Sequence, residues 1–327
     1  MSVLKKVINR MKPGEDIGLD HTGQKGRQRT INPDGSYNMV RKTGRLLGNF
    51  KLFHWLITTS WKHYWLVIAG FYLVDNLFFG GIYYLLGAES LSGVRGNTEF
   101  DKFLSCFFFS CQTFTTVGYG GIHPVGNIAS SLAALEAFLG LMMFALATGT
   151  LYGRFSKAAS KIKFSDNIII APFKNGTAMQ FMVANEMTTT LMEVEARVNI
   201  SWTEHDGSAK PIRRFQQVQL EIDKIAMFPT SWTINHPIDE ESILFGRTLD
   251  EIKTMDVEVF VLLKGYDDVF SQTVYSRRSF TAEQFIYGAK FRRPFEINSD
   301  GKMVMDLTKV GEYDKVTIHQ SALSAIS

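Results

Sequence analysis

Two long apolar segments stand out in the pattern of hydrophobic and polar positions along the first half of the chain. In the first, residues 64–87, only Asp75 and Asn76 are strongly polar, and in the second, residues 128–153, Glu136 is the only charged residue. Each segment is longer than the roughly 20 residues that cross a bilayer core as a helix. The pattern therefore predicts a membrane protein with two spans and a large soluble part.

A shorter apolar segment lies between the two predicted spans. Residues 101–115 contain five phenylalanines but are too short to cross the membrane, and they lead directly into the string TVGYG. Irregular backbone at membrane depth is tolerated only where it is buried in protein or lines a water-filled path. Because Gly118 and Gly120 lack a Cβ and can adopt positive φ, consecutive carbonyl groups can turn toward one axis. We predict a short re-entrant helix followed by a loop that lines an aqueous path.

The residues just before the first span have an amphipathic pattern. Leu46, Phe50, Phe53 and Ile57 recur at spacings of 4, 3 and 4, which places them on one face of a helix. Such a helix is expected to lie along the bilayer surface; the alternative is a simple N-terminal extension of the span. An interfacial aromatic belt at the start of the span comprises Trp55, Trp61, Tyr64 and Trp65.

The pattern changes to period two from about residue 163 onwards. Alternating apolar and polar residues predict β-strands at 190–200, 215–222 and 257–263. Turn-forming residues separate these segments at 205–208, 266–268 and 298–301. Many short strands at regular intervals favour a β-sandwich of roughly 160 residues.

Composition and charge narrow the class of protein further. The 327 residues are 45% hydrophobic and 20% charged with a net charge of +3, which excludes wholesale disorder and argues against a nucleic-acid binder. Residues 1–51 contain eleven basic and four acidic residues. The second span is followed by four basic residues with no acidic residue among them: Arg154, Lys157, Lys161 and Lys163. The positive-inside rule predicts a multi-pass protein of the cell (inner) membrane with both termini in the cytoplasm.

The predicted fold class is therefore membrane α plus soluble β. We expect an N-terminal segment at 1–45, a transmembrane domain at 46–160 and a β-sandwich domain at 161–327. Within the transmembrane domain, the expected elements are a first span at about 62–87, a pore helix at about 101–115 and a second span at about 127–155. Cys106 and Cys111 both lie between the spans, so no disulfide framework braces the soluble part. The histidines lack metal-ligand spacing and no P-loop or G-x-S-x-G motif occurs, so we predict neither an enzyme nor a cofactor.

Four motifs allow comparison with known families. They are NPDGSYN at 32–38 followed by Arg41, QTFTTVGYG at 112–120, LYGRF at 151–155, and SWTINHPID at 231–239 followed by Glu241 and Ser242. Together they resemble the inward-rectifier potassium channels (the Kir family), closest to the prokaryotic KirBac branch. The TVGYG string resembles the potassium-channel selectivity filter, and the motif at 231–239 resembles a signature of the family's cytoplasmic immunoglobulin-like β-sandwich.

The resemblance implies that the filter binds K⁺ as the permeant ligand, because its carbonyl oxygens replace the hydration shell of the ion. One chain supplies one filter strand and four are needed around an axis, so a cyclic homotetramer is the minimal assembly. The expected filter residues are Thr116, Val117, Gly118, Tyr119 and Gly120. Glu136 is expected to accept hydrogen bonds behind the filter rather than to face the ions.

Two constrictions are expected along the pore. Phe144, Thr148 and Tyr152 are spaced i, i+4 and i+8 and form one stripe near the cytoplasmic end of the second span. Converging rings can form a hydrophobic gate that dewets, although such rings can also pack against neighbouring helices. The resemblance places Tyr152 at the family's inner-helix gate. It places a second constriction, the G-loop, at 265–273, with the candidate residues Gly265, Tyr266 and Ser271.

The resemblance also implies partners on the cytoplasmic side. Arg154 and Lys157 fall where the family binds anionic lipid or phosphoinositide headgroups, and basic residues just inside a span contribute about 1 kcal/mol each near an anionic surface. Mg²⁺ and polyamines are the expected pore blockers. Because Phe144 falls where strong rectifiers carry an acidic residue, weak rectification is predicted. Two alternatives stay open: a two-span potassium channel with a different ligand-gated cytoplasmic module, and a membrane-anchored binding protein.

Overall fold

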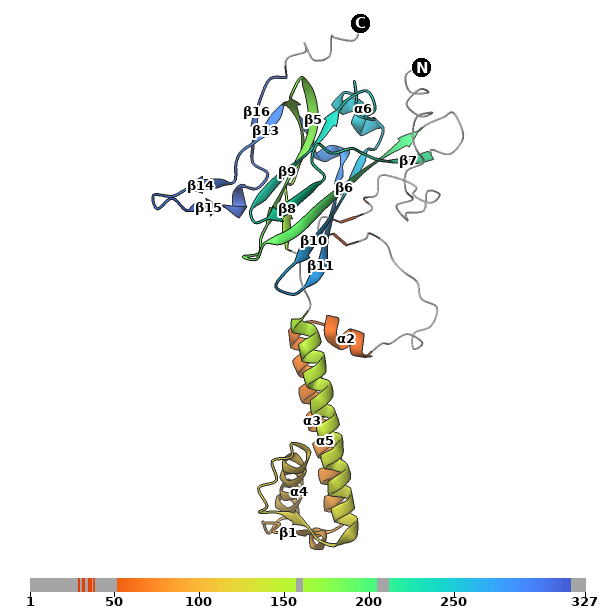
Figure 1. The fold of residues 1–327 in the computed structure, drawn as a ribbon. Helices are drawn as coiled ribbons and strands as arrows, with labels where there is room; N and C mark the ends of the chain where they lie inside the picture. The colour runs from red at the N-terminus through yellow and green to blue at the C-terminus, as the bar shows by residue number, and fades with distance from the viewer. Residues whose placement is uncertain are drawn as a thin grey trace. The chain divides into compact units, whose positions relative to one another are not determined.

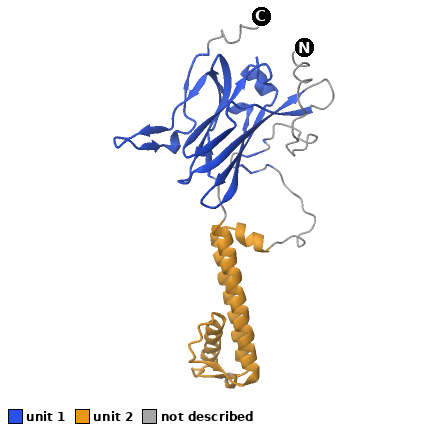
Figure 2. Cartoon of the chain, in the orientation of Figure 1, with its two compact units in different colours: residues 1–42, 158–327 blue, residues 43–157 orange. Residues whose placement is uncertain are grey.

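The computed structural model describes residues 29, 31–32, 35–36, 38, 52–156, 161–204 and 212–318. The chain divides into two compact units: residues 43–157 form one, and residues 1–42 together with 158–327 form the other (Figure 2). Secondary structure divides in the same way. In the described residues the first unit is helical apart from one short pair of strands, and the second consists mainly of β-strands.

The helical unit has four α-helices in its described part: α2 (Leu52–Thr58), α3 (Trp61–Leu85), α4 (Glu99–Phe114) and α5 (Gly126–Phe155) (Figure 1). α3 and α5 are long and apolar enough to cross a membrane. After α3, the 3-10 turn η1 (Ala88–Ser90) leads into β1 (Leu91–Ser92), which pairs antiparallel with β2 (His123–Pro124). These elements confirm the prediction of two apolar helices with a short helix between them.

α2 is a separate helix and not an extension of α3. Ser60, which lies between them, has an extended backbone with φ −64° and ψ 156°, so the helix is interrupted there. The C-terminal end of α5 packs on α2, because a Cβ at Gly153 of α5 would lie 3.1 Å from Ile57 Cδ1. The alternative of a simple N-terminal extension of the span is therefore wrong. Residues 46–51 of the predicted amphipathic helix lie outside the described residues.

α4 is fixed at both of its ends. At its start, Thr98 and Asp101 form a capping box, in which each side chain accepts a hydrogen bond from the backbone amide of the other residue. At its end, a Cβ at Gly140 of α5 would lie only 1.9 Å from Phe114 O. Along α3, a Cβ at Gly80 would lie 2.9 Å from the α4 backbone. Glycine at these two positions lets the three helices pack at close distance.

The second unit is built on β-strands whose bounds are β3 (Ile162–Phe164), β4 (Ile168–Phe173), β5 (Gly176–Asn185), β6 (Leu191–Glu204), β7 (Ile212–Gln217), β8 (Lys224–Phe228), β9 (Ser231–Ile238), β10 (Glu258–Asp267), β11 (Gln272–Thr281) and β12 (Phe285–Tyr287). In the described residues they form two five-stranded sheets. The β10 sheet has the order β11, β10, β6 and β7, with β8 also paired to β6. The β5 sheet has the order β12, β4, β5 and β3, with β9 also paired to β5. Alternate residues of both sheets, among them Phe181, Ile234 and Phe280, share one core, which confirms the predicted β-sandwich.

Shorter elements complete this unit: α6 (Leu249–Thr254), η2 (Ala282–Gln284), β13 (Ala289–Phe291), β14 (Phe295–Ile297), β15 (Met303–Met305), η3 (Leu307–Lys309) and β16 (Tyr313–Lys315). β13 pairs with β16, and β14 pairs with β15 in a hairpin that projects from the sandwich (Figure 1). The predicted turn at 298–301 joins this hairpin and is closed by a hydrogen bond from Asn298 N to Lys302 O at 2.9 Å. The predicted turn at 205–208 lies outside the described residues.

The predicted strand at 215–222 is wrong beyond Gln217. β7 ends at that residue, and residues 218–223 leave the β10 sheet before β8 begins. Val218 and Leu220 nevertheless alternate with polar residues as in a strand, because both side chains contribute to the core of the sandwich. The alternation therefore comes from a crossing segment that inserts every second side chain, and not from strand pairing.

The motif at 231–239 forms β9 and the loop after it. His236 is buried, and its Nδ1 and Nε2 lie 2.6 Å from Gln219 O and 2.8 Å from Ser242 Oγ. Burial lowers the pKa of His236, because desolvation disfavours its charged form. The neutral ring therefore fastens the loop at Ser242 to the sandwich, which is a structural role.

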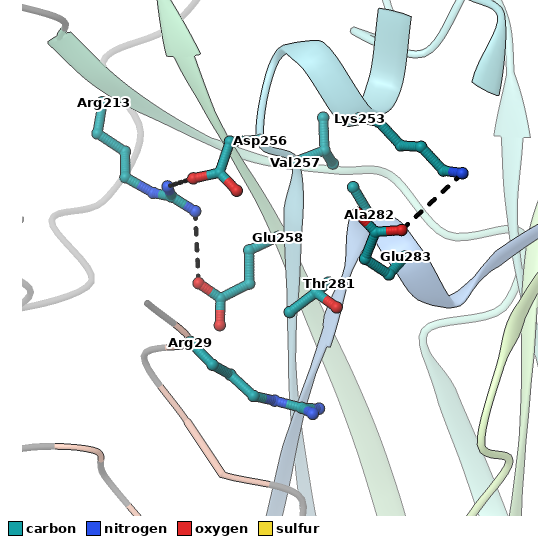
Figure 3. A pocket seen from close by; sticks show the side chains of 9 residues that line it. All are labelled: Arg29, Arg213, Lys253, Asp256, Val257, Glu258, Thr281, Ala282 and Glu283. Atoms are coloured by element: carbon teal, nitrogen blue, oxygen red, sulfur yellow. Dashed lines mark hydrogen bonds and ion pairs between the residues drawn. The ribbon is translucent and has the colours of Figure 1, made fainter. Parts of the chain in front are cut away.

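The described part of the N-terminal segment lies against β11. Arg29 Nε donates to Ser279 Oγ at 3.1 Å, and its Nη2 donates to the carbonyl oxygen of the same serine. Next to this contact is a cavity of about 250 Å³, in which Arg213 forms ion pairs with Asp256 at 2.8 Å and Glu258 at 3.4 Å (Figure 3). Three basic and three acidic side chains line it. Because these charges balance, we interpret the cavity as a space lined by ion pairs that stabilise the fold beside the N-terminal segment.

Candidate functional site

In the loop that follows α4, the backbone φ angle alternates between positive and negative values from residue to residue. Thr116, Gly118 and Gly120 have positive φ angles of 58°, 53° and 79°, whereas Val117 and Tyr119 between them do not. Carbonyl groups along an ordinary strand point alternately to its two sides. A left-handed conformation at every second residue therefore turns successive carbonyl groups toward the same side.

Hydrogen bonds to the end of α4 hold this backbone. The amides of Val117 and Gly118 both donate to Gln112 O, at 3.0 and 3.2 Å, and the amide of Thr116 donates to Thr113 O at 3.0 Å. They stabilise the left-handed conformation of Thr116, which costs about 1–2 kcal/mol for a residue with a Cβ. No described residue donates a hydrogen bond to the carbonyl oxygens of this loop. Those oxygens are therefore available as ligands.

The side chains of the loop do not pack on the described rest of the chain. Val117 and Tyr119 are 53% and 81% exposed, and a Cβ at Gly118 or Gly120 would meet no atom within 4 Å. A row of carbonyl oxygens on one side of a strand can replace the hydration shell of a cation when several such strands face one another. One chain supplies one row, so the arrangement calls for further copies of the chain.

Glu136 is buried on α5 and joins three helices. Its Oε2 accepts a hydrogen bond from Tyr83 Oη of α3 at 2.7 Å, and its Oε1 accepts one from Ser110 Oγ of α4. Ser110 Oγ also lies 3.1 Å from Oδ1 of Asn76, which is fully buried. The carboxylate is thus bound to the helices behind the loop, and both of these hydrogen bonds come from helix residues rather than from the loop itself.

Sequence reasoning missed the partners of Glu136. Asn76 and Ser110 were visible as polar residues inside apolar segments, but nothing in the pattern paired them with one another. For Asp75 the sequence named no partner, and in the described residues its Oδ2 is buried without a hydrogen bond. The neighbouring Asn76, which donates to Tyr72 O at 2.6 Å, is the residue that takes part in the cluster.

The three candidate gate residues on α5 are all exposed in the single chain. Phe144 and Tyr152 are 71% and 73% exposed, and Thr148 between them is also exposed. A Cβ at the adjacent Gly149 would meet no atom within 4 Å. The described part of the chain therefore offers these rings no packing partner of its own, and packing against a neighbouring helix of another copy stays the alternative.

Arg154 at the end of α5 binds the C-terminus of α2. Its Nη1 donates to Leu56 O at 2.6 Å and its Nη2 donates to Thr59 O at 2.8 Å. Its guanidinium also lies over the rings of Trp61 and Tyr64, with its Cζ 4.4 and 4.8 Å from their centroids. The group that the sequence assigned to a lipid headgroup therefore already has partners within the chain. Lys157, the second predicted headgroup residue, lies outside the described residues.

The predicted turn at 266–268 begins too early. β10 continues to Asp267, and the turn comprises the four residues that follow. Asp267 Oδ1 accepts hydrogen bonds from the amides of Val269 and Phe270, at 3.0 and 3.2 Å, and so closes the turn. Turn-forming residue types mark the turn in the sequence, but only strand pairing decides where it starts.

The three candidate G-loop residues lie on this β10–β11 hairpin. Gly265 occupies an irregularity where β10 shifts register against β6, and a Cβ there would lie 3.1 Å from Val194 Cγ2. Tyr266 pairs with Thr273, and Ser271 has a positive φ of 51°. The structure thus brings them together at one end of the β10 sheet.

Comparison with known proteins gives two matching family models. One, described as the C-terminal domain of inward rectifier potassium channels, matches residues 162–326, and the other, described as ion channel, matches residues 71–157. The inward rectifier potassium channel Kirbac3.1 of Paramagnetospirillum magnetotacticum is 31% identical over 290 residues, which cover 88% of this chain and 96% of that protein.

More distant similarity extends to animal proteins. The ATP-sensitive inward rectifier potassium channel 12 of Rattus norvegicus is 25% identical, over 84% of this chain and 69% of that protein. The inward rectifier potassium channel 18 of Homo sapiens is 24% identical, over 84% and 68%. Among solved structures, the Pseudomonas fluorescens alkylpurine DNA glycosylase AlkC bound to DNA gives a TM-score of 0.18 at 9% identity, over 58% of this chain and 48% of that one. That score is too low to indicate a shared fold.

Proposed function

This chain belongs to the inward-rectifier potassium channel family, and we propose that four copies form one pore that conducts K⁺ through rings of carbonyl oxygens at residues 116–120. The family is one of ion channels and not of enzymes, and its membership confirms the resemblance drawn from the four motifs. The observation that carries the proposal is the alternating positive φ at Thr116, Gly118 and Gly120. The carbonyl oxygens of this backbone accept no hydrogen bond from a described residue.

Selectivity for K⁺ rests on a fixed filter backbone. Each oxygen ring can replace water around K⁺ only while the strands keep their conformation. In this chain the filter is held by the bonds to Gln112 O, and the helix that carries them is held by Glu136 through Ser110. Glu136 therefore supports the filter from behind, by way of the pore helix α4, and does not face the ions.

The gates proposed for this pore are a ring at the end of α5 and a second ring at the G-loop. Exposed Phe144, Thr148 and Tyr152 form a stripe that would face the axis of a tetramer, and four Tyr152 rings would close it to hydrated ions. Gly265, Tyr266 and Ser271 would form the second constriction. The β-sandwich and both termini are then cytoplasmic, as the basic residues flanking the spans favour.

Weak rectification is part of the same proposal. Strong rectification requires Mg²⁺ or polyamines to enter the pore, and a ring of carboxylates attracts them by focusing a negative potential. The stripe on α5 carries an aromatic ring at Phe144 and a hydroxyl at Thr148, both without charge. Anionic lipid is proposed to act at the basic residues that follow α5, with Lys157 as the candidate, because Arg154 is bound to α2.

The proposal is tested by Rb⁺ uptake into liposomes that contain the purified protein. We expect uptake that Ba²⁺ blocks, and we expect Gly118→Ala to abolish it while the tetramer still assembles, because alanine rarely adopts a φ of +53°. Gly121→Ala is the matched control, since that position also has open space but no positive φ. A membrane-anchored binding protein would show no uptake, and unchanged selectivity in Gly118→Ala would rule out the filter.

A further inference from the structure

A second cavity lies on the outer face of the β5 sheet, away from the pore residues. It measures about 310 Å³, within the size range of small-molecule sites. Its floor comes from β5 and β9, and its wall comes from residues 290–295, which run from the end of β13 to the first residue of β14. The function proposed above does not use this cavity.

The floor of the cavity combines polar and apolar groups. Phe181 of β5 points into the sandwich core, so the alternate residues Gln180 and Met182 face outward. Thr233 of β9 is the register partner of Met182, and Ser231 lies two residues away on the same face. Two hydroxyls and one amide are therefore presented side by side beside a thioether.

The wall adds positive charge without any carboxylate. Arg292 donates through Nε to both carboxylate oxygens of Asp314 at 3.0 Å, and the charge of that arginine is thereby compensated. Lys290 and Arg293 also line the cavity, and neither has an ion pair with a described residue. Asp314 stands opposite Lys290 in the register of β13 and β16, but its carboxylate is bound to Arg292. Arg292 also lies near Glu312, whose Oε2 is 3.8 Å from its Nη1. Lys290 and Arg293 are thus the two cations at the cavity that form no ion pair with a described residue.

The remaining lining is aromatic. Phe291 and Phe295 are half-buried and, with Pro294, give the wall an apolar part beside its charged part. Guanidinium and ammonium groups together with hydroxyl donors are the groups that bind phosphate oxygens, and Arg supplies two parallel donors for them. An apolar wall next to such a cluster favours a phosphate that carries an organic substituent over the free ion.

We propose that this cavity binds a small phosphate monoester, with its phosphate at Lys290 and Arg293 and its organic part against Phe291 and Phe295. The hydroxyls of Ser231 and Thr233 donate to the remaining phosphate oxygens. The proposal is independent of ion conduction, because it concerns the sandwich alone.

Calorimetric titration of the purified full-length protein, in phosphate-free buffer, tests this site with three probes: inorganic phosphate, glycerol 3-phosphate and phenyl phosphate. We expect saturable binding of one ester per chain, tightest for phenyl phosphate and weakest for inorganic phosphate. The double variant Lys290→Gln/Arg293→Gln should weaken phenyl phosphate at least tenfold. The control Lys302→Gln/Lys315→Gln removes two exposed charges from the neighbouring strands and turn, outside the cavity lining, and should leave binding unchanged.

A second variant distinguishes specific binding at this site from attraction of the probes by general surface charge. Thr233→Val keeps the side-chain volume and the net charge but removes a donor, so it should weaken all three probes severalfold without unfolding the sandwich. No saturable binding at millimolar concentration overturns the proposal, and so does an equal loss in the two double variants. Equal affinity for inorganic phosphate and phenyl phosphate overturns the role given to the two phenylalanines.

Discussion

Replacing Arg154 by methionine is expected to release α2 from α5. The arginine makes two charge-assisted hydrogen bonds to Leu56 O and Thr59 O, at 2.6 and 2.8 Å. These are carbonyl groups at the C-terminal end of a helix, where the helix dipole also favours a cation. Methionine keeps most of the length and apolar character of the side chain but removes the charge and every donor. The variant therefore removes the polar contacts and disturbs the packing least.

The size of the effect follows from these contacts. A hydrogen bond from a charged group contributes about 1.5–3 kcal/mol, and a cation–π contact contributes about 0.5–1 kcal/mol at an exposed site. Ordering an arginine side chain costs about 2 kcal/mol in rotamer entropy. We therefore expect a net loss of about 3 kcal/mol in the attachment of α2, which is about 150-fold in the equilibrium between its attached and released states.

Hydrogen exchange of the α2 amides measures this attachment directly. In bilayers of neutral lipid, Arg154→Met should lower the protection of the last amides of α2 and of Thr59, whose amide donates to Trp55 O at 2.9 Å. Lys62→Met is the matched control, because it removes an exposed cation from the first turn of α3. Arg154→Lys should restore only part of the protection, since an ammonium group lacks the planar fork that reaches both carbonyls.

A role of Arg154 in lipid binding predicts a different set of results. In that case Arg154→Met would leave the α2 amides protected in neutral bilayers, and its defect would appear only as weaker binding of anionic lipid. Arg154→Lys would then behave like the unmodified protein, because a lipid headgroup requires charge rather than a fork. Unchanged protection of α2 in Arg154→Met would therefore refute the attachment of α2 to α5 through this guanidinium.

Three further substitutions on α5 test the remaining assignments. Gly140→Ala should destabilise the protein by about 1–3 kcal/mol through its clash with Phe114 O, measured by thermal unfolding, whereas Gly149→Ala, at an open position, should not. Tyr152→Ala should raise open probability severalfold in flux assays, and unchanged flux would move the gate to Phe144 or the G-loop. Phe144→Asp should create steep block by internal spermine in current–voltage recordings, and steep block in the unmodified channel would contradict weak rectification.

The membrane part of the fold was readily predicted, because its elements are dictated by strong physical constraints. A bilayer demands about 20 apolar residues per span, and a shorter apolar segment followed by TVGYG leaves few alternatives to a re-entrant helix. The β-sandwich followed from period-two alternation, but strand limits did not. Val218 and Leu220 alternate like a strand because they fill the core, although β7 ends at Gln217 and the segment after it makes only single backbone hydrogen bonds to β6 and β9.

The contacts of charged groups could not be predicted in the same way. A basic residue at the end of a span satisfies the topology rule whether it faces lipid or protein, so the sequence alone did not distinguish Arg154 from Lys157. The partners of Arg154 are backbone carbonyl groups, which every residue possesses and no pattern marks. Glu136 was recognised as exceptional because it is charged, but its partner Ser110 is separated from it by 26 residues and carries no distinguishing signal.

Movement of the proposed gate is constrained by where α5 is attached. Its N-terminal half is fixed to α4, by the close approach of Gly140 to Phe114 O and by the hydrogen bond between Glu136 and Ser110. Tyr64 Oη lies 3.1 Å from Ala147 O, and the end of the helix is bound to α2 by Arg154. Tyr152 lies only two residues before Arg154 and cannot move far relative to α2 while those hydrogen bonds persist. Opening therefore requires that α2 move together with the end of α5, or that the Arg154 contacts break. If α2 moves together with α5, Arg154→Met removes the link between the proposed gate and α2. If the Arg154 contacts break on opening, the variant lowers the free energy of opening by up to about 3 kcal/mol, which is about 150-fold in the equilibrium between the closed and open states.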